Sequence, residues 1–351
     1  IWNGDFYKIY FFTMTQKTFK FSSFTTVQYC FDAALNDLKK ITPLNNTIIV
    51  TDETVYAFYK KKLAQWETIV LKPAGEKLKT QHIVDELIQQ LVNKKADKTT
   101  CLVALGGGTV TDLVGYVASI YMRGMRVGFV PTTLLAMVDA AVGGKNGINL
   151  DGYKNSIGTT HQPNFVLYDY HFLKALPHPA WVDGFAEIIK HACIKDAILF
   201  QLLSKHTITS FQKDKKKLAT LIQNNVLLKL RIAQKDELEK NNRYLLNFGH
   251  TIGHAIERVH KISHGQAVAV GMAIDCQIAE KYFGFTQTEK VISLLQQYEL
   301  PIQLKYDKKA LANNFQMDKK KIQNTIQYIF LEKIGKAYIK TIRIADLIKW
   351  L

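Results

Sequence analysis

Residues 243–268, RYLLNFGHTIGHAIERVHKISHGQAV, hold four of the ten histidines of the chain. His250 and His254 are four residues apart, so both project from one face if this segment is helical. His264 follows after a short break. Clustered imidazoles can bind a metal ion or transfer protons, and the spacing alone favours His250 and His254 as a ligand pair. A polar helix face beside a loop histidine is the alternative.

A second candidate is LGGGTVTD, in which Gly106, Gly107 and Gly108 lie where a predicted strand gives way to a helix. Consecutive glycines let backbone N–H groups converge on an anion, and a helix N-terminus adds positive potential. The dinucleotide fingerprint GxGxxG is incomplete, because Thr111 stands at its third glycine. The stretch therefore indicates either an anion-binding turn or a tight turn without a ligand.

The stretch PTTLLAMVDAAVGGKNGINLDGYKNSIG is dense in glycines and polar side chains. Asp139 and Lys145 bracket a pair of glycines, and Lys154 and Asn155 follow in an expected glycine-rich loop. The loop follows a strand of a predicted parallel sheet, where open α/β folds bind ligands. Lysines and amides at this place suit phosphate or carboxylate groups. An irregular surface loop is the alternative.

Glu187 and Lys190 are three residues apart in GFAEIIKHA, and most of their neighbours are apolar. On a helix surface such a pair is a salt bridge worth less than about 1 kcal/mol. A helix that is apolar on nearly every side should instead be buried. A buried carboxylate needs a partner, which a metal ion can supply.

The elements that position these residues change in kind along the chain. The first half predicts strands at 46–52, 67–75, 99–108 and 126–131, and helices at 53–65, 80–95 and 111–123. Repeated βα units imply a parallel, Rossmann-like sheet covered by helices. Later segments are helical, apart from two short strands around Gly335. We expect an N-terminal extension over 1–17, an α/β domain over 18–177 and a mostly α-helical domain over 178–351.

Composition limits the class of protein. A chain of 351 residues with 47% hydrophobic and 22% charged residues is typical of a folded two-domain protein. No apolar run reaches the roughly 20 residues that span a bilayer, and the start lacks the pattern of a signal peptide. The four cysteines lack CxxC spacing, which favours a reducing cytoplasm. The net charge of +16 comes from dispersed lysines, which favours small anionic substrates over nucleic acid.

Six motifs occur in an order that resembles the 3-dehydroquinate synthase family of sugar-phosphate cyclases. They are GGGTVTDLVGYVASIYMRG, PTTLLAMVDAAVGGKNG, YKNSIG, GFAEIIK, RYLLNFGHTIGHAIE and HGQAVAVGM. The resemblance implies a carbon–oxygen lyase that converts 3-deoxy-D-arabino-heptulosonate 7-phosphate to 3-dehydroquinate and phosphate in the shikimate route to aromatic amino acids. It also implies bound NAD, a divalent metal, usually Zn²⁺ with Co²⁺ as the alternative, and a cytoplasmic homodimer.

The reaction implied by the resemblance begins with transient oxidation of the substrate by NAD, and elimination of phosphate follows. Reduction, ring opening and an intramolecular aldol step then close the carbocycle. The protein holds one flexible substrate in the required conformer while cations stabilise the developing negative charge.

By resemblance, the metal ligands are Glu187, His250 and His264, and His254 faces the substrate. The residues implied at NAD follow strand ends and glycines: Asp52, Glu76, Lys79, Gly107, Gly108, Asp112, Thr132, Thr133, Asp139, Lys145 and Lys154. The residues implied at the substrate are mostly cationic: Lys145, Lys154, Asn155, Lys190, Lys229, Arg243, Asn247, His254, one of Lys319 and Lys320, and Arg123 across a dimer interface. Those implied in catalysis are Asp139, Lys145, Lys190, Lys229, Arg243, Asn247 and His254.

Three positions depart from the usual pattern of the family, since Gln266 replaces Glu, and Asn146 and Ala175 replace Thr. They bear on local affinity and leave the metal ligands in place. The alternatives are a cyclase of sedoheptulose 7-phosphate, a polyol dehydrogenase that releases NADH, and a basic nucleic-acid-binding protein. Lys229 and Arg243 favour a substrate with a carboxylate, because two buried cations need an anion.

Overall fold

The computed structural model describes residues 14–151, 153–304, 321–322 and 324–351. The chain divides into two compact units. The first unit consists of Ile1–Pro177 and Lys216–Glu237, and the second consists of His178–Lys215 and Leu238–Leu351. Residues 1–13 of the expected extension lie outside the described residues, as do Lys319 and Lys320.

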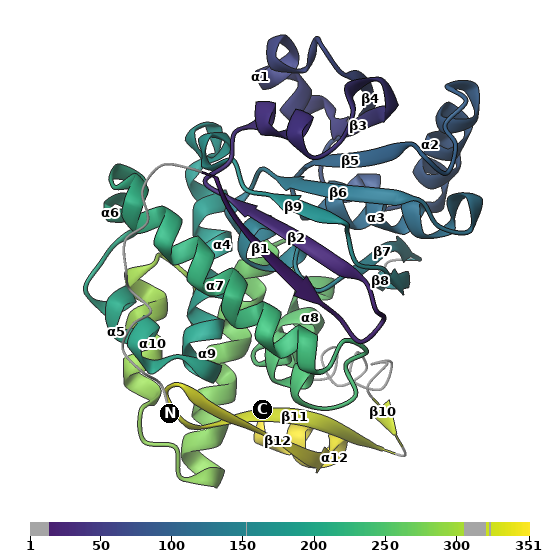
Figure 1. Cartoon of the computed structure of the whole chain (residues 1–351). Coiled ribbons are helices and arrows are strands. Elements are labelled where there is room, and N and C mark those ends of the chain that lie inside the picture. Colours follow the sequence, from purple (N-terminus) through teal and green to yellow (C-terminus); the bar gives the residue numbers. More distant parts are fainter. Residues whose placement is uncertain (1–13, 152, 305–320, 323) are drawn as a thin grey trace. The chain divides into compact units, whose positions relative to one another are not determined.

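A seven-stranded sheet forms the centre of the first unit (Figure 1). Its strand order is β1 (Thr15–Lys20), β2 (Thr26–Phe31), β9 (Phe165–Leu167), β6 (Arg126–Pro131), β5 (Cys101–Gly106), β3 (Thr47–Asp52) and β4 (Glu67–Leu71). Neighbouring strands are parallel, except that β1 and β2 pair antiparallel. β1 begins at Thr15, within the segment that we expected to be an extension.

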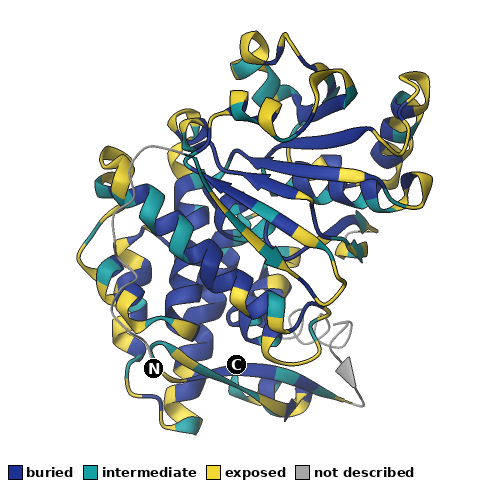
Figure 2. Cartoon of the chain, in the orientation of Figure 1, coloured by how far each residue is buried: buried dark blue, intermediate teal, exposed yellow. Residues whose placement is uncertain are grey.

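The central strands β3 and β5 are buried along their whole length, as Figure 2 shows in dark blue. Their sequences, TIIVTD and CLVALG, have no alternation of polar and apolar residues, which is typical of parallel strands covered on both faces. Helices α1 (Glu53–Leu63), α2 (Gln81–Asn93) and α3 (Gly108–Ile120) follow β3, β4 and β5 along the chain. The predicted parallel, Rossmann-like sheet is therefore confirmed.

The residues that end the strands also start the helices. The carboxylate of Asp52, the last residue of β3, accepts a hydrogen bond from the Val55 N–H at 2.9 Å and caps α1. Thr80 caps α2 through the Ile83 N–H. Gly107 is the N-cap residue of α3 and has no side chain, so no side-chain oxygen at this position accepts from the first N–H groups of the helix.

The segment that we expected to be a glycine-rich loop forms an antiparallel hairpin, β7 (Lys145–Leu150) and β8 (Tyr153–Thr160). Gly147 and Gly158 face each other across it. A Cβ atom on Gly147 would lie 2.5 Å from the carbonyl oxygen of Ile157. These glycines therefore permit a close approach of two strands, which their composition alone does not distinguish from a loop.

Helix α7 (Lys215–Lys235) belongs to the first unit, whereas the sequence assigned it to the helical domain. The carboxylate of Glu237, just after the helix, accepts hydrogen bonds from the Ser23 N–H at 2.8 Å and from Gln162 Nε2 at 3.0 Å. Helical periodicity shows that a helix has an apolar face but not which sheet or helix covers that face.

The second unit is built around α9 (His264–Phe283), most of which is buried. It packs against α4 (His178–Lys195), α8 (His250–Val259), α10 (Thr288–Gln297) and β11 (Thr325–Lys333). β11 pairs antiparallel with β10 (Lys321–Ile322) and β12 (Lys336–Arg343), which confirms the strands predicted around Gly335. The unit also contains α5 (Ala197–Ser204), α6 (Ile208–Lys213) and α12 (Ile344–Trp350). Among the described helices, none is long and apolar enough to cross a bilayer.

Helices α8 and α9 meet through glycine. A Cβ atom on Gly271 of α9 would lie 1.9 Å from the carbonyl oxygen of Gly249, the residue before α8. Gly249 itself has a φ of 76°, in the left-handed region that favours glycine. The two glycines bring the start of α8 against α9 and so set the position of the next residue, His250.

The change Gly271→Ala should destabilise the protein by about 2–3 kcal/mol, because overpacking at this contact exceeds the gain of about 1 kcal/mol in helix propensity. Thermal unfolding followed by circular dichroism measures the effect. Gln277→Ala, on the exposed side of α9, is the control and should change stability by less than about 0.5 kcal/mol. Equal melting temperatures for the two variants would contradict the close contact of α8 and α9.

Candidate active site

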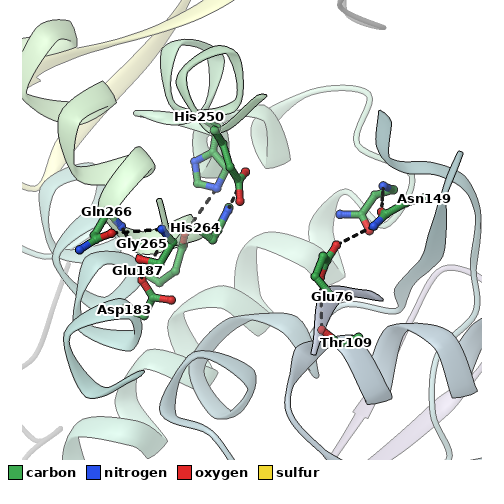
Figure 3. A network of polar contacts seen from close by, with 12 residues as sticks. Glu76, Thr109, Asn149, Asp183, Glu187, His250, His264, Gly265 and Gln266 are labelled. Atoms are coloured by element: carbon green, nitrogen blue, oxygen red, sulfur yellow. Dashed lines mark hydrogen bonds and ion pairs between the residues drawn. The ribbon is translucent and has the colours of Figure 1, made fainter. Parts of the chain in front are cut away.

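Three side chains from three helices meet in the second unit (Figure 3). Glu187 lies on α4, His250 is the first residue of α8, and His264 is the first residue of α9. The Nε2 atoms of both histidines lie 3.4 Å from Oε1 of Glu187. One ligand atom from each residue lies within 4.8 Å of the others, a spacing that one metal ion can bridge.

The carboxylate of Glu187 is completely buried, with a relative exposure of 0%. Lys190, one turn further along α4 and 1% exposed, forms an ion pair with it. Burial alone would raise the pKa of Glu187, but the Lys190 ammonium and a hydrogen bond from His264 oppose it, and this pKa lies well below its usual range. The carboxylate is therefore ionised, which is the form that binds a metal.

His250 is oriented by the turn before α8. Its Nδ1 lies 3.0 Å from the carbonyl oxygen of Phe248. A carbonyl oxygen only accepts, so Nδ1 carries the proton and Nε2 keeps its lone pair toward Glu187. Burial and the nearby Lys190 ammonium lower the pKa of His250, which favours this neutral ligand form.

A buried carboxylate holds the start of α8. Asp275 on α9 accepts a hydrogen bond from the Gly249 N–H at 2.8 Å, and Tyr328 of β11 donates its hydroxyl to the other oxygen of Asp275. Asp275 is 2% exposed and Tyr328 is 1% exposed. Sequence reasoning missed both residues, because each stands alone in an apolar stretch and belongs to none of the six motifs.

His264 lies between two carboxylates. Its Nε2 faces Glu187, and its Nδ1 lies 3.6 Å from Oε2 of Glu257 on α8. Burial lowers the pKa of His264, but hydrogen bonds to Glu187 and Glu257 outweigh it and raise the pKa to about 10. A carboxylate behind a histidine ligand orients the ring at many metal sites. Glu257 was not predicted from the sequence, although its place in GHAIE, three residues after His254, was a usable signal.

His254 does not join His250 in a ligand group, which contradicts the pairing favoured by spacing alone. The two ring planes are nearly perpendicular, at 86°, with centroids 5.2 Å apart. His254, Glu257 and His264 form a second, more exposed group with ligand atoms within 4.8 Å of one another. The group around Glu187 is the better metal site, because its buried charge gains more from a cation.

Two further residues that we expected at the substrate lie on the short helix η8 (Asn242–Asn247), before α8. Arg243 is only 2% exposed, which is unusual for a guanidinium group. Asn247 donates from Nδ2 to Oε1 of Glu239 at 3.0 Å.

A polar network in the first unit joins η4 (Glu76–Leu78), α3 and the β7–β8 hairpin (Figure 3). Glu76 accepts hydrogen bonds from Thr109 Oγ1 at 3.2 Å and from Asn149 Nδ2 at 2.8 Å. Thr109 and Asn149 are therefore neighbours of Glu76, and neither was predicted from the sequence. Thr109 was signalled by its place directly after the three glycines, whereas Asn149 stands among ordinary hairpin residues.

Lys79 connects the same region to α3. It is 3% exposed, and its Nζ lies 2.7 Å from Oδ2 of Asp112 and also donates to Oδ1 of Asn155. Burial raises the pKa of Asp112, and the Lys79 ammonium opposes that rise. The structure thus brings together Lys79, Asp112 and Asn155, which lie far apart in the sequence.

The glycine turn lies at the carboxyl ends of β5 and β6. The Thr132 N–H donates to the carbonyl oxygen of Gly106 at 2.9 Å. A Cβ atom on Gly107 would lie 3.2 Å from Cγ2 of Thr133. Gly107, Gly108, Thr132 and Thr133 therefore share one edge of the sheet, the edge at which open α/β sheets bind ligands.

Asp139 of η6 (Ala136–Ala140) binds Lys229 of α7 within the first unit. The Lys229 Nζ lies 2.6 Å from Oδ1 of Asp139 and 2.8 Å from its carbonyl oxygen. The three remaining cations expected at ligands in this unit, Lys145, Lys154 and Arg123, are exposed.

Two of the three departures from the family pattern have a structural explanation. Gln266 accepts a hydrogen bond from the Ser263 N–H at 3.1 Å and completes the capping box of α9. Asn146 donates to the carbonyl oxygens of Gly144 and His161, each at 2.9 Å, and ties the turn before β7 to the end of β8. Nothing in the structure explains Ala175.

Comparisons with known proteins identify the family of the chain. The model of the 3-dehydroquinate synthase N-terminal domain matches residues 69–183, and that of the C-terminal domain matches residues 184–321. A 3-dehydroquinate synthase of Thermoanaerobacter pseudethanolicus is 36% identical over 340 residues, which cover 91% of this chain and 93% of the relative.

Two solved structures share the fold. A 2-epi-5-epi-valiolone synthase from Streptomyces hygroscopicus, with NAD⁺ and Zn²⁺ bound, is 28% identical with a TM-score of 0.79, covering 87% of this chain and 89% of that one. A 2-deoxy-scyllo-inosose synthase complexed with carbaglucose-6-phosphate, NAD⁺ and Co²⁺ is 24% identical with a TM-score of 0.81, covering 95% and 98%. On the identity and coverage of its relatives, the chain belongs to the 3-dehydroquinate synthase family.

Proposed function

We propose that the chain is a 3-dehydroquinate synthase that converts 3-deoxy-D-arabino-heptulosonate 7-phosphate to 3-dehydroquinate and phosphate. The observation that carries the proposal is the convergence of Glu187, His250 and His264 in a member of this family. Its place in metabolism is then the shikimate route to aromatic amino acids. We propose the cytoplasm as its location and a homodimer as its assembly, with Arg123 reaching the phosphate of the substrate in the partner subunit.

The residues of the second unit fit a divalent metal. One ionised carboxylate and two imidazoles with Nε2 directed at it form a donor set suited to Zn²⁺ or Co²⁺, and three protein ligands leave positions open for substrate. Two similar structures were solved with Zn²⁺ or Co²⁺. When bound, the metal supplies Lewis acidity toward a substrate hydroxyl. Glu257 holds the ring of His264 from behind.

The carboxyl edge of the first-unit sheet fits NAD. Gly107 and Gly108 let the pyrophosphate approach the start of α3, and Glu76 and Lys79 lie where a ribose would bind. The full set proposed for NAD is Asp52, Glu76, Lys79, Gly107, Gly108, Asp112, Thr132, Thr133, Asp139, Lys145 and Lys154. When bound, the nicotinamide supplies a hydride acceptor and donor.

The substrate proposed here carries both a phosphate and a carboxylate, so it needs several cations. The first unit offers Lys145, Lys154, Asn155 and Lys229, and the second unit offers Lys190, Arg243, Asn247 and His254. An incoming anion would share Lys229 with Asp139. The buried, planar guanidinium of Arg243 suits a carboxylate or phosphate in two-point contact.

The substrate can be tested directly, because a cyclase of sedoheptulose 7-phosphate would not need a carboxylate. With NAD and Zn²⁺, we expect phosphate release and a carbocyclic product from 3-deoxy-D-arabino-heptulosonate 7-phosphate. Turnover of sedoheptulose 7-phosphate should be at least about 100-fold slower, because this substrate lacks the carboxylate that the proposed cationic side chains would bind. Steady accumulation of NADH would instead indicate a polyol dehydrogenase. Faster turnover of sedoheptulose 7-phosphate would contradict the proposed substrate.

Removal of one metal ligand should abolish metal-dependent turnover. We expect His250→Ala and Glu187→Gln to lower Zn²⁺ affinity by more than about 100-fold and to leave NAD binding within about twofold, since the NAD residues proposed above lie in the first unit. Competition with a chromogenic chelator measures the metal, and fluorescence titration measures NAD. His178→Ala, an exposed histidine of α4 paired with Glu299, is the control. Equal Zn²⁺ content in all these proteins would contradict the ligand assignment.

A change of Arg243 should affect catalysis more than folding. Arg243→Lys keeps the charge but loses the two-point geometry, so we expect kcat/KM to fall by about 100-fold. The melting temperature should stay within a few degrees of that of the unaltered protein. If Arg243→Lys and Arg243→Met both fail to fold, the guanidinium is a structural group instead.

A further inference from the structure

The carboxylate of Asp183 on α4 binds the start of α9 (Figure 3). Oδ1 of Asp183 accepts hydrogen bonds from the hydroxyl of Ser263 and, at 3.0 Å, from the N–H of Gly265. Ser263 and Gly265 are the two neighbours of His264 in the chain. One oxygen atom therefore binds both chain neighbours of a proposed metal ligand, one through its side chain and the other through its backbone.

The same helix carries the carboxylate of the metal group. Asp183 and Glu187 are four residues apart on α4, so they project from one face of that helix. Asp183 binds the groups that flank His264, while Oε1 of Glu187 lies 3.4 Å from its Nε2. Helix α4 thus contacts the start of α9 at two points one turn apart, which constrains both where His264 lies and where its ring points.

The contact is too close for a side chain at the second position. A Cβ atom on Gly265 would lie 2.6 Å from the carbonyl oxygen and 2.7 Å from the Cα atom of Asp183. Gln266 completes the arrangement through its capping box with Ser263. Its neutral amide accepts the Ser263 N–H without placing a second carboxylate next to the hydroxyl that Asp183 binds.

We infer that Asp183 is a positioning residue for the metal ligand His264, an inference that rests on the metal site proposed above. Asp183 belongs to none of the described side-chain groups that could hold a metal ion. It fixes the start of α9 and so holds the His264 imidazole in place against Glu187. Groups that bind metal ligands from behind orient those ligands in the same way.

A second helix-capping carboxylate in the same unit is a control that distinguishes the positioning of a metal ligand from ordinary helix capping. Asp196 accepts a hydrogen bond from the Leu199 N–H at 2.9 Å and caps α5, but it flanks none of the proposed metal ligands. Asp183→Ala and Asp196→Ala each remove one carboxylate from a helix start. If capping were the only role of Asp183, the two changes would affect metal binding equally.

The experiment measures Zn²⁺ affinity by chelator competition and the visible absorption of the Co²⁺-loaded full chain, with melting temperatures taken alongside. We expect Asp183→Ala to weaken Zn²⁺ binding by about 10- to 100-fold and to alter the Co²⁺ spectrum. Asp196→Ala should change affinity by less than twofold at a similar loss of melting temperature. Asp183→Asn, which keeps a carbonyl acceptor, should recover most of the affinity.

The outcomes distinguish this inference from the proposed function. If His250→Ala loses Zn²⁺ while Asp183→Ala binds it as tightly as Asp196→Ala does, the positioning role is overturned and the metal site stands. If His250→Ala binds Zn²⁺ as tightly as the unaltered chain, the metal site is overturned and the positioning role with it. Should Asp183→Ala fail to fold, Ser263→Ala removes one of the two donors alone and is expected to weaken Zn²⁺ binding by several-fold.

Discussion

The buried charge of Glu187 is the constraint on which the second unit depends. A carboxylate with no exposure is stable only beside compensating positive charge or strong hydrogen-bond donors. Lys190 on the same helix and the His264 imidazole at the start of α9 provide them. Because α4, α8 and α9 must bring Glu187, His250 and His264 to the same point, the positions and crossing angles of the three helices depend on one another.

Buried charges at the edge of the sheet in the first unit also lie beside opposite charges. Among the described residues of this unit, two lysines are buried, and each lies in an ion pair: Lys79 with Asp112 and Lys229 with Asp139. Each pair ties an element outside the sheet to the region where the strands end. Parallel strands present their carboxyl ends together, so polar side chains that follow different strands gather at one edge.

Much of the sheet could be predicted from the sequence, because β3 and β5 are continuous apolar runs whose local pattern suffices. The grouping of Glu187, His250 and His264 could not be predicted from spacing. His250 and His254 are neighbours on one helix, whereas His250 and His264 meet only because α8 and α9 pack closely, and the family resemblance supplied that choice. Asp183 and Asp275 emerge only from the packing of helices. The glycines of the β7–β8 hairpin suit a loop and a close strand pair equally well.

The connection of the chain through the two units has a consequence for its synthesis. The chain leaves the first unit after Pro177 and returns for Lys216–Glu237. During translation, the amino-terminal sheet is therefore finished before the helix that completes its contacts has been made. Until then Asp139 lacks Lys229, and Gln162 lacks Glu237. The first unit can therefore complete its contacts only after His178–Lys215, the first part of the second unit, has been synthesised.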